Sequence, residues 1–330
     1  MRGHLLFAAA VAGAMTMTVY AQAPTKATPE SLVKDAKRAA GLDYAGTFLR
    51  ICVAPDNLQA APARGAAPPT ARTVPDRALW YAKPYKVFDN LYFVGTKIHS
   101  SWALTTTDGI VLIDTLFDYA IEPEIVEGLT TLGLDPRSIK YVLISHAHGD
   151  HDQGAALLQS RYHAKIVMGA ADWDATLQRP ASTPGGVPQR DVVVGPEGTR
   201  IKLGDTTVDV IATPGHTPGT LSYIFPVKDG GRSMVVAYAG GTAFNFPRRA
   251  ENFAIYRDSQ RKTAKAAAAA GATVVMTNHT EFDRAYDRVR IVQLPRTGGE
   301  KHPYEADAAT VQRYFEMGAD CAEAQRLSMQ

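Results

Sequence analysis

Short apolar runs alternate with segments of helical periodicity along most of the chain. The run at residues 139–144 is almost wholly apolar and predicts a buried strand. A hairpin is predicted at residues 86–95, and further strands at 102–107, 110–114, 165–168, 200–203, 207–212, 221–226, 233–239 and 273–276. Helices are predicted at residues 29–40, 119–132, 152–162, 170–177, 258–270 and 304–327. Strands interleaved with helices indicate an α/β fold.

A polar cluster directly follows the strand at residues 139–144. It reads Ser145-His146-Ala147-His148-Gly149-Asp150-His151 and holds three of the nine histidines of the chain. Such crowded imidazoles would repel one another when protonated, and the whole cluster would be costly to desolvate. A bound cation removes both problems, so the cluster predicts a metal site. The alternative is a surface loop that happens to be rich in histidine.

Two further histidines also follow predicted strands, His216 in the loop 213–219 and His279 after the last strand. A lone histidine in such a place more often has a structural role. Because both histidines follow apolar strands and a dense histidine cluster is also present, we predict that they bind metal. The candidate ligands are therefore His146, His148, Asp150, His151, His216 and His279. Two sets of three protein ligands match the count of catalytic zinc sites with an open position. The other histidines are assigned to the leader (His4) and to surface or packing positions (His99, His163 and His302).

Composition is that of an ordinary globular protein, with 330 residues, 45% of them hydrophobic and 21% charged. A net charge of +2 gives no electrostatic case for nucleic acid or for an acidic membrane surface as partner. The two cysteines, Cys52 and Cys321, could pair in an oxidising compartment or remain as buried thiols, and the disulfide is favoured. Neither lies near a histidine cluster, so a thiolate ligand is not expected.

The N-terminus has a basic start, an apolar stretch and the segment Ala21-Gln22-Ala23, which predict a signal peptide over residues 1–23. A membrane anchor is the alternative, although Gly13 and several threonines interrupt the apolar run. We expect a periplasmic or secreted protein without a membrane partner after cleavage. Residues 24–80 are predicted to form an extension and linker, and residues 81–330 a catalytic domain.

The motif His146-x-His148-x-Asp150-His151, the loop at 214–219 and the late His279 together resemble the metallo-β-lactamase superfamily, over most of residues 85–327. The resemblance implies an α/β (α+β) fold, an αββα sandwich of two mixed β-sheets flanked by helices, with a dinuclear site at one edge of the sheets. It also implies two Zn²⁺ ions per chain. One would be held by His146, His148 and His216, and the other by Asp150, His151 and His279.

The turn at residues 237–242 refines the resemblance. Hydroxyacylglutathione hydrolases, lactonases and ribonucleases of the superfamily carry a bridging aspartate there, but this turn has no carboxylate and no cysteine. His151 is then the natural third ligand of the second metal, which is similar to the third subclass of class B β-lactamases. The serines that often lie near the substrate carboxylate in that subclass are missing. Candidate substitutes, which could equally be packing residues, are Tyr223, Tyr238, Thr242 and Asn278.

The resemblance thus implies an exported zinc hydrolase of a small-molecule substrate, with a role in antibiotic resistance. A metal-bridging hydroxide would open a cyclic amide, and Asp150 would orient this nucleophile as well as bind metal. The alternatives are a lactonase, esterase or phosphodiesterase of the same fold, an iron-dependent persulfide dioxygenase, and an exported binding protein without activity. The missing aspartate disfavours the usual hydrolases of the first group, and six intact ligand positions disfavour the binding protein.

Overall fold

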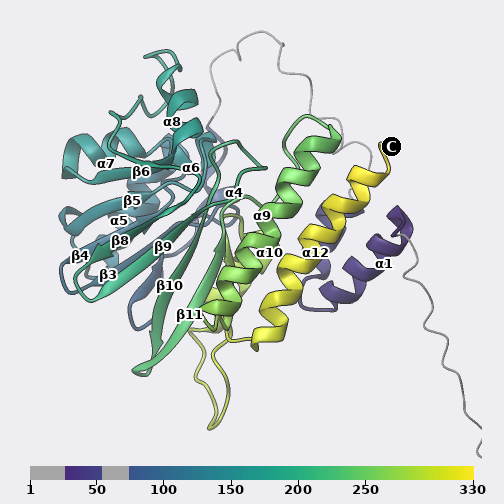
Figure 1. Cartoon of the computed structure of the whole chain (residues 1–330). Coiled ribbons are helices and arrows are strands. Elements are labelled where there is room, and N and C mark those ends of the chain that lie inside the picture. Colours follow the sequence, from purple (N-terminus) through teal and green to yellow (C-terminus); the bar gives the residue numbers. More distant parts are fainter. Residues whose placement is uncertain (1–26, 54–73) are drawn as a thin grey trace, which may run out of the picture.

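The computed structural model describes residues 27–53 and 74–330. Its two β-sheets pack face to face, and helices cover the outer face of each sheet, which gives four layers (Figure 1). Helices such as α7 and α8 lie on one side of the sandwich, and α9, α12 and α1 lie on the other. This is the αββα sandwich of two mixed sheets that the resemblance implied, and that prediction is confirmed.

The first sheet has seven strands in chain order, from β1 to β7. The strands from β1 to β4 pair antiparallel, and those from β4 to β7 pair parallel. Their bounds are β1 Tyr85–Phe88, β2 Leu91–Phe93, β3 Trp102–Thr106, β4 Gly109–Ile113, β5 Ile139–Leu143, β6 Lys165–Gly169 and β7 Val192–Val194. The short strand β7 was not predicted from the sequence.

The second sheet has five strands in the order β12-β11-β10-β9-β8. All neighbours pair antiparallel except β11 and β12, which run parallel. Their bounds are β8 Thr199–Leu203, β9 Thr206–Ala212, β10 Leu221–Asp229, β11 Arg232–Ala239 and β12 Val274–Thr277. Because β11 and β12 are parallel, the turns that follow them lie at the same edge of the sheet.

Most of the helices pack on the outer face of one of the two sheets. The outer face of the first sheet packs against α4 Arg77–Trp80, η1 Asp118–Ala120, the π-helical η2 Ile121–Val126, α5 Glu127–Thr131, α7 Ala155–Tyr162 and α8 Ala170–Leu177. The outer face of the second sheet packs against α1 Pro29–Ala40, α2 Ala45–Ile51, α9 Ala250–Ala269 and α12 Ala308–Leu327. Shorter helices are η3 Pro136–Ser138, α6 Gly149–Asp152, α10 Thr280–Asp283 and α11 Ala285–Ile291.

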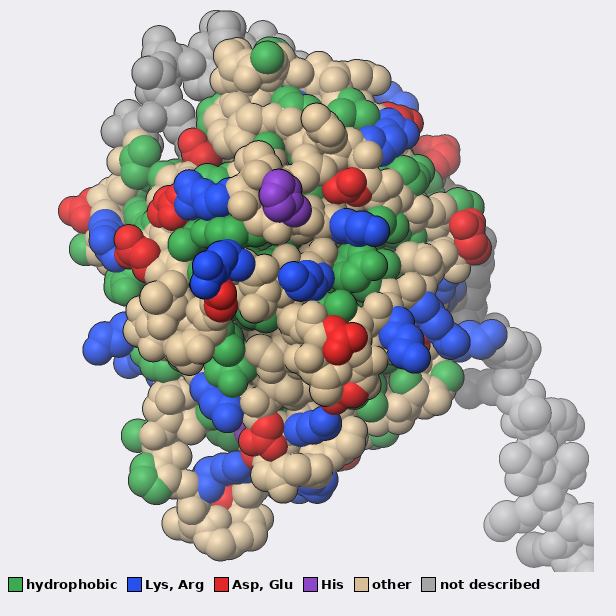
Figure 2. Space-filling view, turned by 90° about the vertical axis from the view of Figure 1, so that its left-hand side faces the viewer, with side chains coloured by type: hydrophobic (Ala, Val, Ile, Leu, Met, Phe, Trp, Pro, Cys, Tyr) green, Lys and Arg blue, Asp and Glu red, His purple; other side chains and the backbone are tan. Residues whose placement is uncertain are grey.

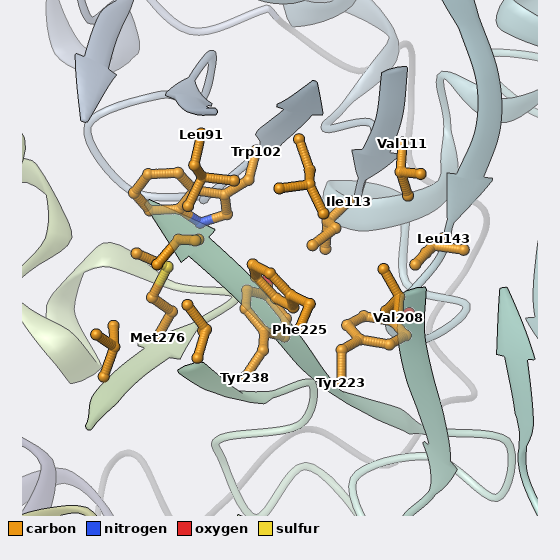
Figure 3. Close-up of a cluster of buried hydrophobic side chains, with 14 of the residues drawn as sticks. Leu91, Trp102, Val111, Ile113, Leu143, Val208, Tyr223, Phe225, Tyr238 and Met276 are labelled. Carbon is orange, nitrogen blue, oxygen red and sulfur yellow. The ribbon is translucent and has the colours of Figure 1, made fainter. Parts of the chain in front are cut away.

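The main core lies between the two sheets (Figure 3). Along β3, Trp102 and Leu104 point into this core, whereas Ala103 packs under the outer helices. Side chains that alternate in this way while both faces are buried explain why the strands are apolar throughout. Tyr223 and Tyr238 are fully buried members of the same core.

Helix α9 begins at Ala250, eight residues before the predicted start. Its first turns carry Phe253 and Tyr256, which pack in a separate cluster with Ala322 of α12 and with Phe244. The Ala-rich and Lys-rich stretch has a high helix propensity, which the sequence shows. Packing against another helix extends α9 beyond that stretch. The predicted helix 29–40 is confirmed, with a capping box at Thr28.

Cys52 and Cys321 form a disulfide, with their Cα atoms 5.0 Å apart, as the favoured interpretation of the sequence had it. The predicted signal peptide (1–23) falls outside the described residues, as do residues 24–26 and 54–73 of the predicted extension and linker. Within the described ranges, no helix is both long and apolar enough to span a membrane. Basic and acidic side chains are interspersed over the face shown in Figure 2, so no single sign of charge dominates that face.

Candidate metal centre

The six predicted ligands lie together at one edge of the sandwich. His146 and His148 follow β5 directly, and Asp150 and His151 sit in the single-turn helix α6. His216 lies in the loop between β9 and β10, and His279 follows β12. The first sheet thus supplies one loop and the second sheet two, and the loops meet where the strands end.

The first histidine cluster is formed by His146, His148 and His216. The Nε2 atom of His216 lies 3.1 Å from Nε2 of His146 and 3.2 Å from Nδ1 of His148. Zinc–nitrogen bonds of about 2.0–2.1 Å in a tetrahedral site place neighbouring ligand atoms about 3.3–3.4 Å apart. These two distances are close to the spacing of neighbouring corners of a zinc tetrahedron, and all three donor atoms lie within 4.8 Å of one another.

Backbone carbonyls fix which ring nitrogen of two of these histidines faces the cluster. Nδ1 of His146 donates to the carbonyl oxygen of Gly240 at 2.9 Å, and Nδ1 of His216 donates to that of Ala243 at 2.7 Å. A carbonyl only accepts, so Nδ1 carries the proton and Nε2 presents its lone pair. Burial and the neighbouring imidazoles lower the pKa of both rings, that of His216 to about 3. Both are neutral imidazoles, the form that binds metal.

The second cluster contains Asp150, His151 and His279. Oδ2 of Asp150 lies 3.2 Å from Nε2 of His151 and 3.3 Å from Nε2 of His279. The two Nε2 atoms are 3.2 Å apart. Burial would lower the pKa of His151, but Asp150 and Asp114 outweigh it and raise that pKa to about 10. This position therefore strongly favours positive charge, which suits a cation.

His99, which the sequence analysis assigned to a surface or packing position, lies beside this second cluster. Its Nε2 atom lies 3.5 Å from Oδ2 of Asp150, and it groups with Asp150 and His279 as a set of potential ligands. The sequence signal was weak, because His99 precedes a strand and stands alone. The same assignment holds for the other two histidines: His163 is exposed, and His302 stacks on Phe88 in the core.

Asp114 organises the site and was missed by the sequence analysis. This buried carboxylate accepts hydrogen bonds from the backbone N–H of Ser145 at 2.7 Å and from its hydroxyl at 2.8 Å. It also accepts from Nδ1 of His151 at 3.0 Å and from the hydroxyl of Tyr238 at 3.3 Å. A carboxylate bonded to the far nitrogen of a metal-binding histidine orients that ring. The available signal was a charged residue directly after the apolar strand β4.

Asp172 links the first histidine loop to the second. Its carboxylate accepts from the backbone N–H of Ala147 at 2.7 Å, from the Thr217 hydroxyl at 2.7 Å and from the backbone N–H of Gly219 at 2.9 Å. The guanidinium of Arg179 adds a hydrogen bond to the carbonyl of Ala147 at 2.6 Å. The two loops that carry the first cluster are therefore held in a fixed relation.

The four candidate substrate contacts are all buried. Tyr223 and Tyr238 lie in the core between the sheets (Figure 3), which is the packing role that the sequence left open. The hydroxyl of Thr242 donates to Oδ1 of Asn278 at 3.2 Å, and the Asn278 amide donates to the Gly240 carbonyl at 2.8 Å. These contacts support the turn at residues 240–242, whose Gly240 carbonyl also contacts His146.

The turn after β11 has no space for a ligand side chain at its glycines. A Cβ added to Gly240 would lie 1.7 Å from the carbonyl oxygen of Leu221. One added to Gly241 would lie 2.5 Å from Cβ of His216. The turn instead supplies backbone carbonyls to the histidines of the first cluster.

The metal-facing surface is only partly covered. Asp150 and His279 have side chains that are 17% and 21% exposed, and His148 is half-buried. The ring of Phe117 meets His99 edge-on at 5.2 Å and stacks on Tyr119 at 5.5 Å. An incoming molecule would therefore meet polar donors beside an aromatic rim.

Comparison with known proteins places these features in a family context. Residues 94–268, more than half of the chain, match the model of the Metallo-beta-lactamase superfamily. A hydroxyacylglutathione hydrolase of Acidiphilium cryptum is 38% identical over 87 residues, which are 26% of this chain and 31% of that protein. One of Rhodopseudomonas palustris is 29% identical over 123 residues, 37% of this chain and 41% of that protein. The chain thus matches well under half the length of these curated relatives.

Solved structures match over a greater length. BJP-1, a subclass B3 metallo-beta-lactamase of Bradyrhizobium japonicum, aligns with a TM-score of 0.58 and 25% identity, over 76% of this chain and 98% of that chain. The metallo-beta-lactamase GOB-18 of Elizabethkingia meningoseptica aligns with a TM-score of 0.63 and 20% identity, over 81% and 100%. Native FEZ-1 of Legionella gormanii aligns with a TM-score of 0.62 and 22% identity, over 76% and 98%.

Proposed function

The chain belongs to the metallo-beta-lactamase superfamily, and from this premise we propose that it is an exported dizinc hydrolase of β-lactamase type. His146, His148 and His216 would hold one zinc ion. Asp150, His151 and His279 would hold the other. The observation that carries the proposal is the convergence of both donor sets, with spacings that fit zinc, at a partly exposed edge of the sandwich.

The donor chemistry supports zinc at both positions. Imidazole nitrogens and one carboxylate form the two sets, and this mixture suits zinc better than the oxygen-only shells of magnesium or calcium. The sets adjoin one another, since the rings of His146 and His151 are 4.3 Å apart. Two adjacent zinc ions would supply a Lewis acid for a carbonyl oxygen and a water made nucleophilic at neutral pH.

The residues of the chain would orient the reactants. Asp150 keeps an ionised carboxylate at the site, because His151 and His279 outweigh the effect of burial and hold its pKa well below the ordinary value. Being partly exposed, this carboxylate can accept a hydrogen bond from the attacking water and so aim it at the substrate. The proposal needs no serine nucleophile, and the Ser145 hydroxyl is instead bonded to Asp114.

We favour a cyclic amide, such as a β-lactam, as the substrate. The solved neighbours that align over nearly their whole length carry the name metallo-beta-lactamase. The turn at 239–242 supports the same choice, because it lacks the carboxylate associated above with hydroxyacylglutathione hydrolases and its glycines have no room for one. The second candidate is hydrolysis of a thioester, lactone or other ester, favoured by the names of the curated relatives.

A metal analysis combined with a substrate panel tests the proposal. The purified chain should bind two zinc ions and hydrolyse a penicillin, a cephalosporin or a carbapenem. His146→Ala should abolish turnover together with metal at the first cluster, whereas His163→Asn, at an exposed position with left-handed backbone, should retain both. Turnover of a hydroxyacyl thioester of glutathione or of a lactone, with every β-lactam untouched, would replace the first candidate by the second. A single bound iron would favour the dioxygenase.

Export and antibiotic resistance form part of the same proposal. The basic and apolar start of the chain supports a signal peptide that is cleaved after Ala23. Mass spectrometry of protein from the periplasm of an expressing bacterium should show a mature chain beginning at Pro24 or close to it. Expression of the precursor should raise the β-lactam concentration that inhibits growth, and His146→Ala should remove this protection.

A further inference from the structure

We propose that His99 is a fourth protein ligand of the second metal ion, so that this ion has a closed protein shell of His99, Asp150, His151 and His279. The inference rests on the proposed dizinc site and adds to it a ligand that the resemblance did not imply. Its basis is the position of one ring nitrogen, the way its loop is built, and the role of the neighbouring carboxylate.

One carboxylate oxygen is the common neighbour of three imidazoles. Oδ2 of Asp150 lies 3.2 Å from Nε2 of His151, 3.3 Å from Nε2 of His279 and 3.5 Å from Nε2 of His99. The donor atoms of His99, Asp150 and His279 all lie within 4.8 Å of one another. Neighbouring corners of a zinc tetrahedron are about 3.3–3.4 Å apart. The 3.5 Å between Asp150 and the third imidazole, that of His99, is close to this spacing.

The loop of His99 is built onto the loop of His279. The backbone N–H of Ser100 donates to the carbonyl of Asn278 at 2.9 Å, and that of Thr280 donates to the carbonyl of Ile98 at 2.9 Å. His99 and His279 form an isolated antiparallel bridge between these segments. The backbone that carries the His99 imidazole is therefore paired with the backbone that carries an expected ligand, which favours preorganised metal binding.

The turn that carries His99 is also locally fixed. The hydroxyl of Thr96 accepts from the backbone N–H of His99 at 2.8 Å, and the carbonyl of His99 accepts from the backbone N–H of Thr96 at 2.8 Å. A Cβ at Gly95 would lie 2.5 Å from the His99 carbonyl oxygen, so the backbone approaches too closely for any other residue. These contacts hold the backbone of His99 in place beside the site without help from a ligand.

A purely packing role explains less of this arrangement. The ring of Phe117 contacts His99 edge-on at 5.2 Å, and any flat ring at position 99 would allow that contact. Packing does not require a nitrogen to face the oxygen that two expected metal ligands also face. The His99 side chain is also 13% exposed, and it lies on the partly open side of the cluster.

A closed second shell makes the two metal positions unequal. The first cluster would keep three protein ligands and an open position, as in catalytic zinc sites. The second would have four protein ligands, so its ion would bind more tightly and leave more slowly. The substrate would then coordinate first at the ion held by His146, His148 and His216.

Titration of the metal-free chain with Zn²⁺ by calorimetry tests the inference. His99→Ala and His99→Asn should each lower the affinity for one of the two zinc ions by at least about 10-fold and leave the affinity for the other unchanged. Two controls are matched to the alternatives: Phe117→Leu removes the ring contact, and His163→Asn removes a histidine at the surface. Both controls should bind two zinc ions as the wild-type chain does.

The absorption spectrum of the chain loaded with two Co²⁺ ions gives a readout of coordination. Loss of the His99 nitrogen should change the visible bands of one ion, while Phe117→Leu should leave them unchanged. Unchanged affinities and spectra in a folded His99→Asn variant overturn the inference and leave the dizinc proposal standing. A wild-type chain that binds fewer than two zinc ions overturns both.

Discussion

At the scale of single residues, the site depends on groups that do not face the metals. Asp114 receives four hydrogen bonds, and these join the strand end at Ser145, the ring of His151 and the core residue Tyr238. Its buried negative charge supports the cation position and selects the His151 tautomer that exposes Nε2. The charge of this carboxylate is therefore part of the site, although the side chain is fully buried.

Asp114→Asn should lower the affinity for the second zinc ion about 10-fold to 100-fold. The reason is that a neutral amide would replace the negative charge that is bonded to His151. Zinc titration of the metal-free variant measures the effect, with melting temperature as a check on folding. Asp108→Asn, in an exposed turn, is the matched control and should bind as the wild-type chain does. A zinc affinity that is equal in the two variants would contradict the role assigned to Asp114.

Gly241→Ala should displace His216, since the added Cβ would lie 2.5 Å from the Cβ of that histidine. We expect a loss of about 1–3 kcal/mol in the free energy of unfolding and weaker zinc binding at the first cluster. Chemical denaturation and zinc titration measure the two effects. Gly298→Ala, where an added Cβ meets nothing within 4 Å, should change neither. An unaltered first site in Gly241→Ala would show that the turn can relax.

Sequence reasoning found the residues of the two clusters that a local pattern or a strand end marks, and it missed residues that only the pairing of distant segments brings to the site. His146, His148, Asp150 and His151 are close in the sequence, so their proximity needed no knowledge of the fold. His99 joins them only because its loop pairs with residues 278–280, a contact that periodicity does not encode. Asp114 was hidden for the same reason, since its side-chain partners lie just after β5, in α6 and in β11.

At the scale of elements, strand positions were predictable because burial on both faces makes the strands apolar, while their assignment to two sheets came only from the resemblance. The short β7 was missed because it pairs through just three residues, Val192–Val194. The start of α9 was missed because tertiary packing of Phe253 and Tyr256, and not helix propensity, decides it. The π-helical geometry of η2 also had no readable signal.

Glu124 in η2 predicts a dependence of stability on pH. Its buried carboxyl accepts from the backbone N–H of Ala82 at 2.9 Å, and burial raises its pKa from 4.5 to about 8. The folded state favours the protonated form of this carboxyl. Its contribution to the free energy of unfolding is therefore fully present below about pH 4.5 and is lost as the pH rises through about 8.

Glu124→Gln keeps the acceptor for Ala82 but cannot ionise, so it should gain stability over the wild-type chain as the pH rises from 6 to 9. The gain should be on the order of a few kcal/mol at the alkaline end. Denaturant titrations at several pH values measure it. Glu127→Gln, at an exposed position of α5, should show no such trend. A constant difference between Glu124→Gln and wild type across this range would refute the assignment.

At the scale of the whole molecule, the proposed metals would join the two sheets. The first cluster takes His146 and His148 from the loop after β5 in the first sheet and His216 from the second sheet. Zinc that binds only the folded chain should raise the free energy of unfolding, by about 2.7 kcal/mol at 100 times the dissociation constant. A chelator should therefore lower the melting temperature, and added zinc should restore it. A melting temperature that ignores both additions would contradict a clamping role.

The disulfide acts at the same scale. Cys52 follows α2, Cys321 is buried in α12, and the two are separated by 269 positions in the sequence. A cross-link across so long a loop reduces the conformational freedom of the unfolded chain. Loss of the disulfide should therefore lower the free energy of unfolding by about 2–4 kcal/mol. The double variant Cys52→Ala and Cys321→Ala should melt at a lower temperature and should no longer respond to reductant, whereas the wild-type chain should respond.

Zinc content separates this effect from damage to the metal site. None of the proposed ligands lies in α2 or α12, and the disulfide joins elements that pack on the outer face of the second sheet. The double cysteine variant should therefore bind two zinc ions with wild-type affinity below its melting temperature. Loss of zinc in parallel with the disulfide would mean that α2 and α12 hold the second sheet in the position that the metal centre requires.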